Sequence, residues 1–330
     1  MNYKLISKLL GYILLIETAF MAPSLILSFV DKDGSSSGFL IPMAIALVLG
    51  FILINLKSRK RSLSPRDGIL IVTASWILVS LVGAIPLYIS ANMTYVDSFF
   101  EIVSGFTTTG ATVISGIESY PRSVIFWRSI THWIGGMGIL VFTVGLLPKL
   151  GVSGFQIFKA ESPGPVAGKI ESTISQSSKR LYIIYITLSA ALFICLKIAG
   201  MSVFDSLVHT FGVLGTGGFS SYGDSFMSYK GNAVHFILSF FMFLSATNFT
   251  IYSLISRKKF KEVLQNDELK LWILITLGSI ILIAIDLFLN GYSSAFMAFR
   301  DSAFQVTSIS STSGFANADY ELWPSFSKFI

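Results

Sequence analysis

The sequence predicts an all-α membrane protein built from tandem helix–pore-loop–helix repeats. Three observations lead to this prediction. First, 53% of the 330 residues are hydrophobic and only 13% are charged, with a mean hydropathy of +0.71, whereas soluble domains carry about 25% charged residues. Second, long apolar stretches recur along the whole chain. Third, a glycine-centred loop occurs three times at the same internal spacing.

The apolar stretches predict seven spanning helices, because each is close to the roughly 20 residues needed to cross a hydrocarbon core of about 30 Å. The first continues beyond the length of a signal-peptide core and is followed at once by another span, so we expect it to be retained. The predicted spans are 4–30, 38–56, 69–91, 123–146, 180–200, 231–256 and 271–290.

The basic residues predict the orientation of these spans. Lys4, Lys8 and the segments 57–66, 149–180 and 257–270 hold 17 of the 24 Lys and Arg residues. If seven spans alternate, all of these fall on one face, which the positive-inside rule makes cytoplasmic. We therefore expect a cytoplasmic N-terminus and interpret the net charge of +6 as a topology signal, with no nucleic-acid partner. Cys195 is the only cysteine, which excludes an internal disulfide framework.

Each of the three repeated loops begins with Asp-Ser and reaches a glycine thirteen residues after the aspartate. The pairs are Asp97 with Gly110, Asp205 with Gly218, and Asp301 with Gly314. An aromatic residue follows each glycine, namely Tyr120, Tyr229 and Trp323. Self-similarity of this kind indicates an array of one structural unit.

We expect each unit to read as helix, short helix, extended loop, helix. About ten residues follow each aspartate before the loop, a helix of roughly 15 Å or half the membrane, with Asp-Ser as its predicted N-cap. Non-helical backbone at membrane depth survives only where protein buries it or water lines it. The loops should therefore be re-entrant and face an aqueous path. Two spans separate equivalent points of neighbouring units, so the units share one orientation, unlike inverted repeats.

The loop residues suit a monovalent cation whose hydration shell is replaced by backbone carbonyls. Glycine permits the positive φ values that such a loop requires, and no acidic side chain lies within 107–110 or 311–314. Each short helix would also direct its partial negative charge at the loop. Ordinary turns are the alternative for any single loop. The sequence contains no HExxH, GxSxG or P-loop motif, so we do not expect an enzyme.

At these residues the chain resembles the TrkH/KtrB superfamily of potassium transporters, which includes the plant HKT proteins, with the TrkH branch most similar. The resemblance covers essentially the whole chain. Its stretches are FTTTGAT at 106–112, HWIGGMGIL at 132–140, AESPGP at 160–165, GTGGFS at 215–220 and STSGFANADYELWP at 311–324.

The resemblance implies four units around a pseudo-fourfold pore, preceded by two extra transmembrane helices, with one filter glycine from each unit. It implies a potassium filter without further cofactor, and glycine rather than serine at Gly110 implies preference for potassium over sodium. The implied K⁺-binding residues are Thr107, Thr108, Thr109, Gly110, Gly215, Thr216, Gly217, Gly218, Ser311, Thr312, Ser313 and Gly314.

The predicted organisation places two N-terminal helices in 1–66, pore unit 1 in 67–150, a cytoplasmic linker in 151–178, pore unit 2 in 179–260 and an incomplete unit 3 in 261–330. We expect this chain, which ends before a fourth unit, not to conduct as a monomer by itself. The alternative function is a non-conducting assembly or sensor partner of such a transporter. The resemblance further implies a homodimer in the cell membrane, with a cytosolic nucleotide-binding regulatory subunit of the TrkA type.

Some residues admit two interpretations from sequence. Intramembrane charge is a functional candidate by default, but residues near the interface can snorkel to water, which leaves both readings open for Arg128, Lys197 and Asp286. Glycines 135, 136 and 138 favour close helix packing over a hinge. Asn248 is expected to form a helix–helix hydrogen bond. His132, His209 and His235 lack metal-ligand spacing and are expected to be hydrogen-bonded or interfacial.

Overall fold

The computed structural model describes residues 2–56, 64–138 and 174–330, and within these ranges all regular secondary structure is helical. It divides into two units, unit 1 spanning Met1–Ile183 and unit 2 spanning Ile184–Ile330. Each unit is described by itself.

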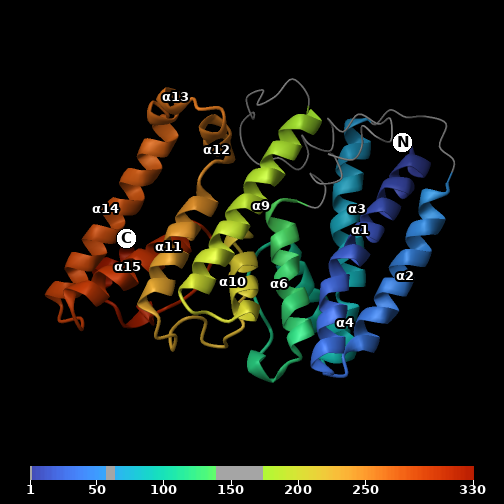
Figure 1. Cartoon of the computed structure of the whole chain (residues 1–330), viewed down its shortest axis with the longest axis horizontal. Helices are drawn as coiled ribbons and strands as arrows, with labels where there is room; N and C mark the ends of the chain where they lie inside the picture. Colours follow the sequence, from blue (N-terminus) through green and yellow to red (C-terminus); the bar gives the residue numbers. More distant parts are fainter. Residues whose placement is uncertain (1, 57–63, 139–173) are drawn as a thin grey trace. The chain divides into compact units, whose positions relative to one another are not determined.

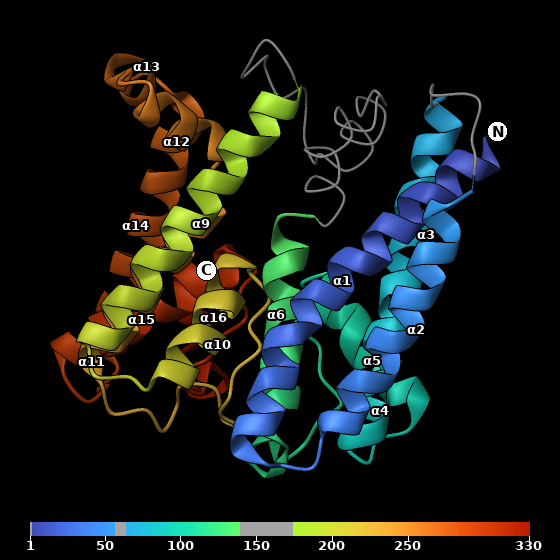
Figure 2. The same cartoon turned by 45° about the vertical axis from the view of Figure 1, so that its right-hand side comes forward.

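Unit 1 is a bundle in which the long first helix lies against most of the others. Helix α1 packs against α2, α3 and α6, and α5 packs against α3 and α6; α1 and α2 run side by side in Figure 1 and Figure 2. Gly11 and Gly50 allow this contact, because a Cβ on Gly11 would lie 2.9 Å from the carbonyl oxygen of Gly50. The elements are α1 (Tyr3–Asp31), α2 (Ser36–Ile54), α3 (Pro65–Gly83), α4 (Ile85–Ser90), α5 (Tyr95–Phe106), the 3-10 turn η1 (Ile117–Ser119) and α6 (Arg122–Gly136).

Unit 2 packs α15 against α11 and α14, while α10 lies on α11 and α16 on α14. Helix α9 contains the boundary between the units. The elements are α9 (Ile174–Ile198), α10 (Val203–Leu214), α11 (Asn232–Ala246), α12 (Phe249–Ser256), α13 (Phe260–Leu264), α14 (Asp267–Leu289), α15 (Ala295–Ser310), the 3-10 turn η3 (Tyr320–Leu322) and α16 (Ser325–Phe329).

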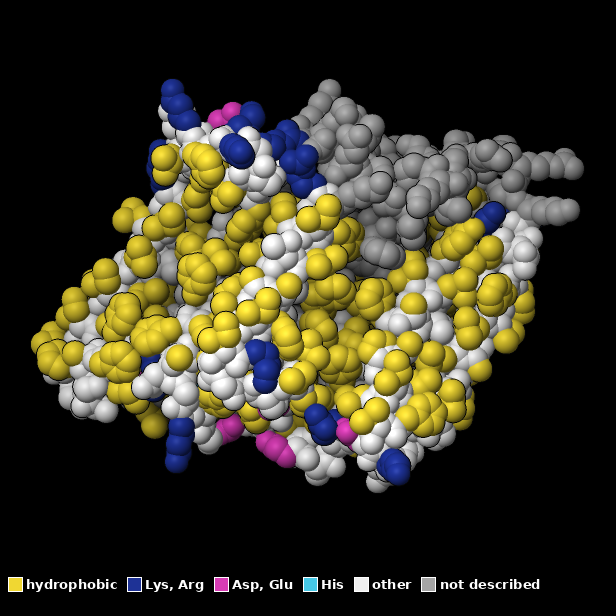
Figure 3. Space-filling view, in the orientation of Figure 1, with side chains coloured by type: hydrophobic (Ala, Val, Ile, Leu, Met, Phe, Trp, Pro, Cys, Tyr) yellow, Lys and Arg dark blue, Asp and Glu magenta, His cyan; other side chains and the backbone are white. Residues whose placement is uncertain are grey.

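Five helices in the described ranges are long and apolar enough to cross a membrane: Tyr3–Asp31, Ser36–Ile54, Arg66–Ser90, Arg180–Ile198 and Asp267–Leu289. They correspond to five of the seven predicted spans. These helices carry exposed apolar side chains, such as Val48 (59% exposed) and Leu274 (69% exposed). Hydrophobic side chains cover the helices in Figure 3. An exposed apolar surface of this kind suits lipid as the surrounding solvent.

The two other predicted spans are not seen as single long helices. The predicted span 231–256 is wrong as a continuous helix, because α11 and α12 meet at an angle of 92°. Asn248 lies at this break and is the N-cap of α12, since its side chain accepts from the Thr250 backbone N–H. Its Nδ2 donates to Glu268 of α14, which confirms the expected helix–helix hydrogen bond. Of the predicted span 123–146, α6 covers Arg122–Gly136, and residues 139–146 lie outside the described residues.

Part of the predicted cytoplasmic charge, seven of the 17 basic residues, lies outside the described residues, since these omit 57–63 and 139–173. The linker predicted at 151–178 likewise lies outside them, except for its last five residues. The segment 257–270 is described and connects α12, α13 and α14. Figure 3 shows Lys and Arg side chains over this end of unit 2.

Unit 1 encloses the acidic side chain of Glu17 within its apolar packing. Glu17 on α1 is fully buried, and a Cβ on Gly83 would meet its Oε1 together with Ile102 and Phe106 of α5. Among the described residues neither carboxyl oxygen has a hydrogen-bond partner.

We therefore expect Glu17→Met to stabilise the protein by about 1–3 kcal/mol, because an unsatisfied buried polar group costs about that much and methionine fills a similar volume. Thermal unfolding in detergent should show a higher midpoint for Glu17→Met. A lower midpoint would mean that the carboxyl group stabilises the native state.

Candidate ion-binding site

Three short helices lead into the three predicted loops. Helices α5 and α10 have 12 residues each and α15 has 16. The predicted Asp-Ser N-caps are wrong. Thr94 and Ser202 are the caps, each accepting from the backbone N–H of the aspartate three residues later, Asp97 or Asp205. In both, the hydroxyl also donates to that aspartate at 2.6 Å. Asp301 lies inside α15, which begins at Ala295.

The backbone of the three loops alternates in the sign of φ. The residue two before each glycine has positive φ: Thr108 (53°), Thr216 (53°) and Thr312 (61°). The glycines also have positive φ, at 77° for Gly110, 76° for Gly218 and 75° for Gly314, while the residues between them do not. Positive φ is an outlier for a β-branched residue and costs about 1–3 kcal/mol, a strain that clusters at functional sites.

One hydrogen bond closes each loop on its helix in the same way. The N–H of the residue before the filter glycine donates to the carbonyl six residues before that glycine, at 2.9 Å in all three loops. These bonds join Thr109 to Ser104, Gly217 to Gly212, and Ser313 to Ser308. The three loops therefore share one backbone conformation, although only the threonine and the glycine with positive φ are common to all three.

The residue at this carbonyl also holds the start of the segment that leaves the loop. Ser104 donates through Oγ to the carbonyl of Ala111, and Ser308 donates to that of Phe315, each at 2.6 Å. Gly212 takes this place in the second loop, and a Cβ there would lie 2.9 Å from the Phe219 carbonyl. In the first and third loops a serine side chain holds the segment that leaves the loop, whereas in the second loop the backbone itself approaches this segment closely.

The side-chain oxygens of the loops are largely engaged with one another. The hydroxyls of Thr107 and Thr109 lie 2.8 Å apart, and Ser311 donates to Ser313 at 2.8 Å. The second loop has glycines at both corresponding positions, 215 and 217. Side chains at these positions therefore offer no complete set of ligands, whereas backbone carbonyls are present in every loop.

Within unit 2 the second and third loops are in contact. A Cβ on Gly218 would fall on the carbonyl oxygen of Ser313. The segments leaving the two loops are joined as well, since Phe226 N–H donates to the Ala316 carbonyl at 2.8 Å and Ser225 accepts from Ala316 N–H at 3.1 Å. The first loop, with Gly110, belongs to unit 1.

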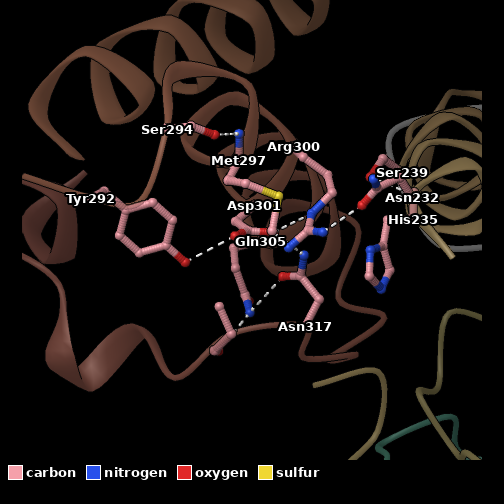
Figure 4. Close-up of polar contacts among 11 residues, drawn as sticks. Asn232, His235, Ser239, Tyr292, Ser294, Met297, Arg300, Asp301, Gln305 and Asn317 are labelled. Atoms are coloured by element: carbon pink, nitrogen blue, oxygen red, sulfur yellow. Dashed lines mark hydrogen bonds and ion pairs between the residues drawn. The ribbon is translucent and has the colours of Figure 1, made fainter. Parts of the chain in front are cut away.

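A buried polar network lies behind the third loop (Figure 4). Asp301 accepts from Arg300 at 2.6 Å, from Tyr292 at 2.9 Å and from Asn317 at 2.8 Å. Arg300 also donates to Asn232 at 2.6 Å. Burial, together with the hydrogen bond to Asp301, raises the pKa of Tyr292 to about 12, so the phenol remains a donor at neutral pH.

The first loop is backed by a buried ion pair. Arg128 of α6 is 4% exposed and donates through Nε to Glu101 of α5, which is fully buried, at 2.5 Å. This decides the open question about Arg128, which does not reach the surface. Glu101 was not singled out from sequence, although its spacing of nine residues before Gly110 matches that of His209 before Gly218.

Gly135 of α6 supports the end of α5. A Cβ at this position would fall on the carbonyl oxygen of Phe106, the last residue of α5 before the loop. This close approach favours the packing interpretation of this glycine over the hinge. Among the described residues no group of three or more metal-ligating side chains occurs, and the three histidines lie on α6, α10 and α11.

Comparisons with known proteins agree with this architecture. A family model described as "Cation transport protein", TrkH, matches residues 35–330. The "Trk system potassium uptake protein TrkH" of Escherichia coli K12 is 34% identical over 99% of this chain and 69% of its own length. The protein of the same name from Halomonas elongata is 33% identical, covering 100% and 70%.

The fold is also similar to a solved structure. The crystal structure of the potassium transporter TrkH from Vibrio parahaemolyticus matches with a TM-score of 0.84 and 29% identity, covering 100% of this chain and 69% of that chain. This match confirms the predicted fold class of helix–pore-loop–helix units. On the family match and the relatives' identity and coverage, the chain belongs to the TrkH family of cation transport proteins.

Proposed function

We propose that this chain is an ion-translocating subunit for potassium uptake across the cell membrane, of the Trk type. Membership of the TrkH family and the names of relatives that match nearly the whole chain support this function. Both the family and these relatives are transporters, which agrees with the expectation that the chain is not an enzyme.

The proposed ion-binding groups are the backbone carbonyls of 107–110, 215–218 and 311–314. The observation that carries this proposal is the shared alternation of φ in three loops, held at a cost in strain at three threonines. Carbonyl oxygens can replace the hydration shell of potassium without a fixed carboxylate. The C-terminal ends of α5, α10 and α15 meet these loops, and their partial negative charge favours a cation there.

The orientation and the partners belong to the same proposal. The N-terminus would be cytoplasmic, as the distribution of Lys and Arg favours. The α12–α13 connection, with Arg257, Lys258 and Lys259, would then face the cytosol. A homodimer and a TrkA-like nucleotide-binding regulatory subunit rest on the family resemblance.

The test is rubidium uptake in cells that lack their own potassium transport systems. The chain as printed is compared with the chain joined to a fourth pore unit taken from the Escherichia coli relative, called here the extended chain. We expect the extended chain to restore uptake. We expect Gly110→Asp and Gly218→Asp to reduce uptake by more than about tenfold, because each would place a side chain and a negative charge among the carbonyls proposed to bind the ion.

Gly116→Asp is the matched control. Gly116 also has positive φ, at 64°, and open space around it, but it lies outside the predicted filter. This variant should transport normally, since aspartate tolerates the left-handed region. Uptake by neither the printed nor the extended chain would contradict the proposed function. Unchanged uptake and selectivity in the Gly110 and Gly218 variants would contradict the assignment of the filter alone.

A further inference from the structure

The position nine residues before each filter glycine carries a buried polar side chain of different chemistry in each repeat. These residues are Glu101, His209 and Gln305, exposed by 0%, 0% and 2%. Each contacts the segment that leaves its loop, called here the exit segment. We propose that these three side chains, called here the clamp residues, are positioning residues that set the selectivity of the filter for potassium over sodium. This inference rests on the proposed carbonyl filter.

In the first repeat the exit segment offers donors, and the clamp residue is an acceptor. Glu101 accepts from the Thr112 hydroxyl at 2.9 Å and from the Val113 N–H at 3.1 Å. It also accepts from Arg128 Nε. An ionised carboxylate has only acceptor sites and can serve all three donors. Its charge is balanced by the guanidinium, without which burial would be costly.

In the second repeat the partner is a hydroxyl, and the clamp residue is an imidazole. His209 Nδ1 lies 2.8 Å from the Asp205 carbonyl and Nε2 lies 3.0 Å from Ser220 Oγ. Because a carbonyl only accepts, Nδ1 must donate, and in the neutral ring Nε2 then accepts from the Ser220 hydroxyl. Ser220 Oγ in turn accepts from the Tyr222 N–H at 3.0 Å. This chain of bonds fixes the exit segment to α10.

In the third repeat the exit segment offers acceptors, and the clamp residue is a donor. Gln305 Nε2 donates to Asn317 Oδ1 at 3.3 Å and to the Ala318 carbonyl at 3.0 Å. Asn317 is held in this orientation because its Nδ2 donates to Asp301. The contacts among Gln305, Asn317 and Asp301 are drawn in Figure 4.

The chemistry of each clamp residue thus matches what its exit segment presents. The contacts begin two or three residues after the filter glycine, so a displaced exit segment displaces the carbonyls that precede it. Selection between two cations of equal charge depends on the placement of those oxygens. A residue needed only to fill space would not have to match donor with acceptor.

Isosteric exchanges separate these two roles. Gln305→Glu would place a carboxylate against two acceptors, and Glu101→Gln would remove the charge facing Arg128 and place an amide N–H₂ near the Val113 N–H. In proteoliposomes containing the extended chain, each variant should raise sodium permeability relative to rubidium by about tenfold, since one unsatisfied buried group accounts for a change of that size. The exposed changes Gln265→Glu and Glu262→Gln are the matched controls and should leave this ratio unchanged.

His209 provides the conservative comparison. His209→Gln keeps an acceptor for Ser220 and should retain potassium selectivity, whereas His209→Leu fills similar space without one and should lose it. These two His209 variants still test the inference if Gln305→Glu or Glu101→Gln fails to fold. Thermal unfolding in detergent shows whether each variant folds.

The failure of this inference is distinguishable from failure of the proposed function. If the extended chain selects potassium and the clamp variants keep its sodium-to-rubidium ratio, or lose flux and thermal stability without a change in that ratio, the clamp inference is wrong. If the extended chain itself carries no rubidium, the proposed function is wrong.

Discussion

Gly218→Ala is expected to abolish potassium uptake and to lower stability much more than Gly314→Ala does. Both glycines have positive φ, 76° and 75°, so both variants incur the cost of a left-handed alanine, about 1–2 kcal/mol. Only at Gly218 would the new Cβ also fall on a carbonyl oxygen, that of Ser313, whereas the space around Gly314 is open. Overpacking of this kind adds about 1–3 kcal/mol.

Thermal unfolding of the chain as printed measures this difference directly, because the two variants share their backbone strain. Rubidium uptake by the extended chain with Gly218→Ala gives the functional effect, which we expect to exceed tenfold. Equal midpoints for the two variants would contradict the contact between the second and third loops.

The second large effect is expected for Gly135→Ala. The added Cβ would fall on the Phe106 carbonyl and within 3.0 Å of the Thr108 side chain, at the point where α5 ends and the first loop begins. Relief of this overlap requires α5 and α6 to separate, which moves the loop. We expect rubidium uptake by the extended chain to fall by about tenfold or more, with a stability loss of about 1–3 kcal/mol.

Gly278→Ala is the control for this variant. Gly278 also lies within a helix, and a Cβ added there would have nothing within 4 Å of it. Alanine should therefore stabilise α14 by up to about 1 kcal/mol and leave uptake unchanged. Normal uptake by Gly135→Ala would show that the end of α5 does not depend on this contact.

The repeated units were predictable because a few residues recur at a fixed spacing in each unit. Thirteen residues from aspartate to glycine recur three times, and a positive φ at each of these glycines accounts for the constraint. The caps were missed although the sequence holds their signal. Thr94 and Asp97, like Ser202 and Asp205, form the Ser/Thr-x-x-acid pattern of a capping box.

The break between α11 and α12 was harder to predict, because composition alone reads 231–256 as one apolar run. No proline or glycine marks it; Thr247 leaves the helix and Asn248 caps the next one. The clamp residues were missed for another reason. Glutamate, histidine and glutamine are different residue types, so residue identity does not relate them, although each lies nine residues before its filter glycine.

We propose that main-chain carbonyl oxygens of the three glycine loops bind the transported ion. Anomalous X-ray scattering from crystals of the extended chain grown with rubidium tests it most directly. We expect rubidium to be bound by the main-chain carbonyls beside Gly218 and Gly314, whose loops are in contact within unit 2, and by those beside Gly110. Rubidium bound only by side-chain carboxylates elsewhere, with these carbonyls turned away from any ion, would contradict it.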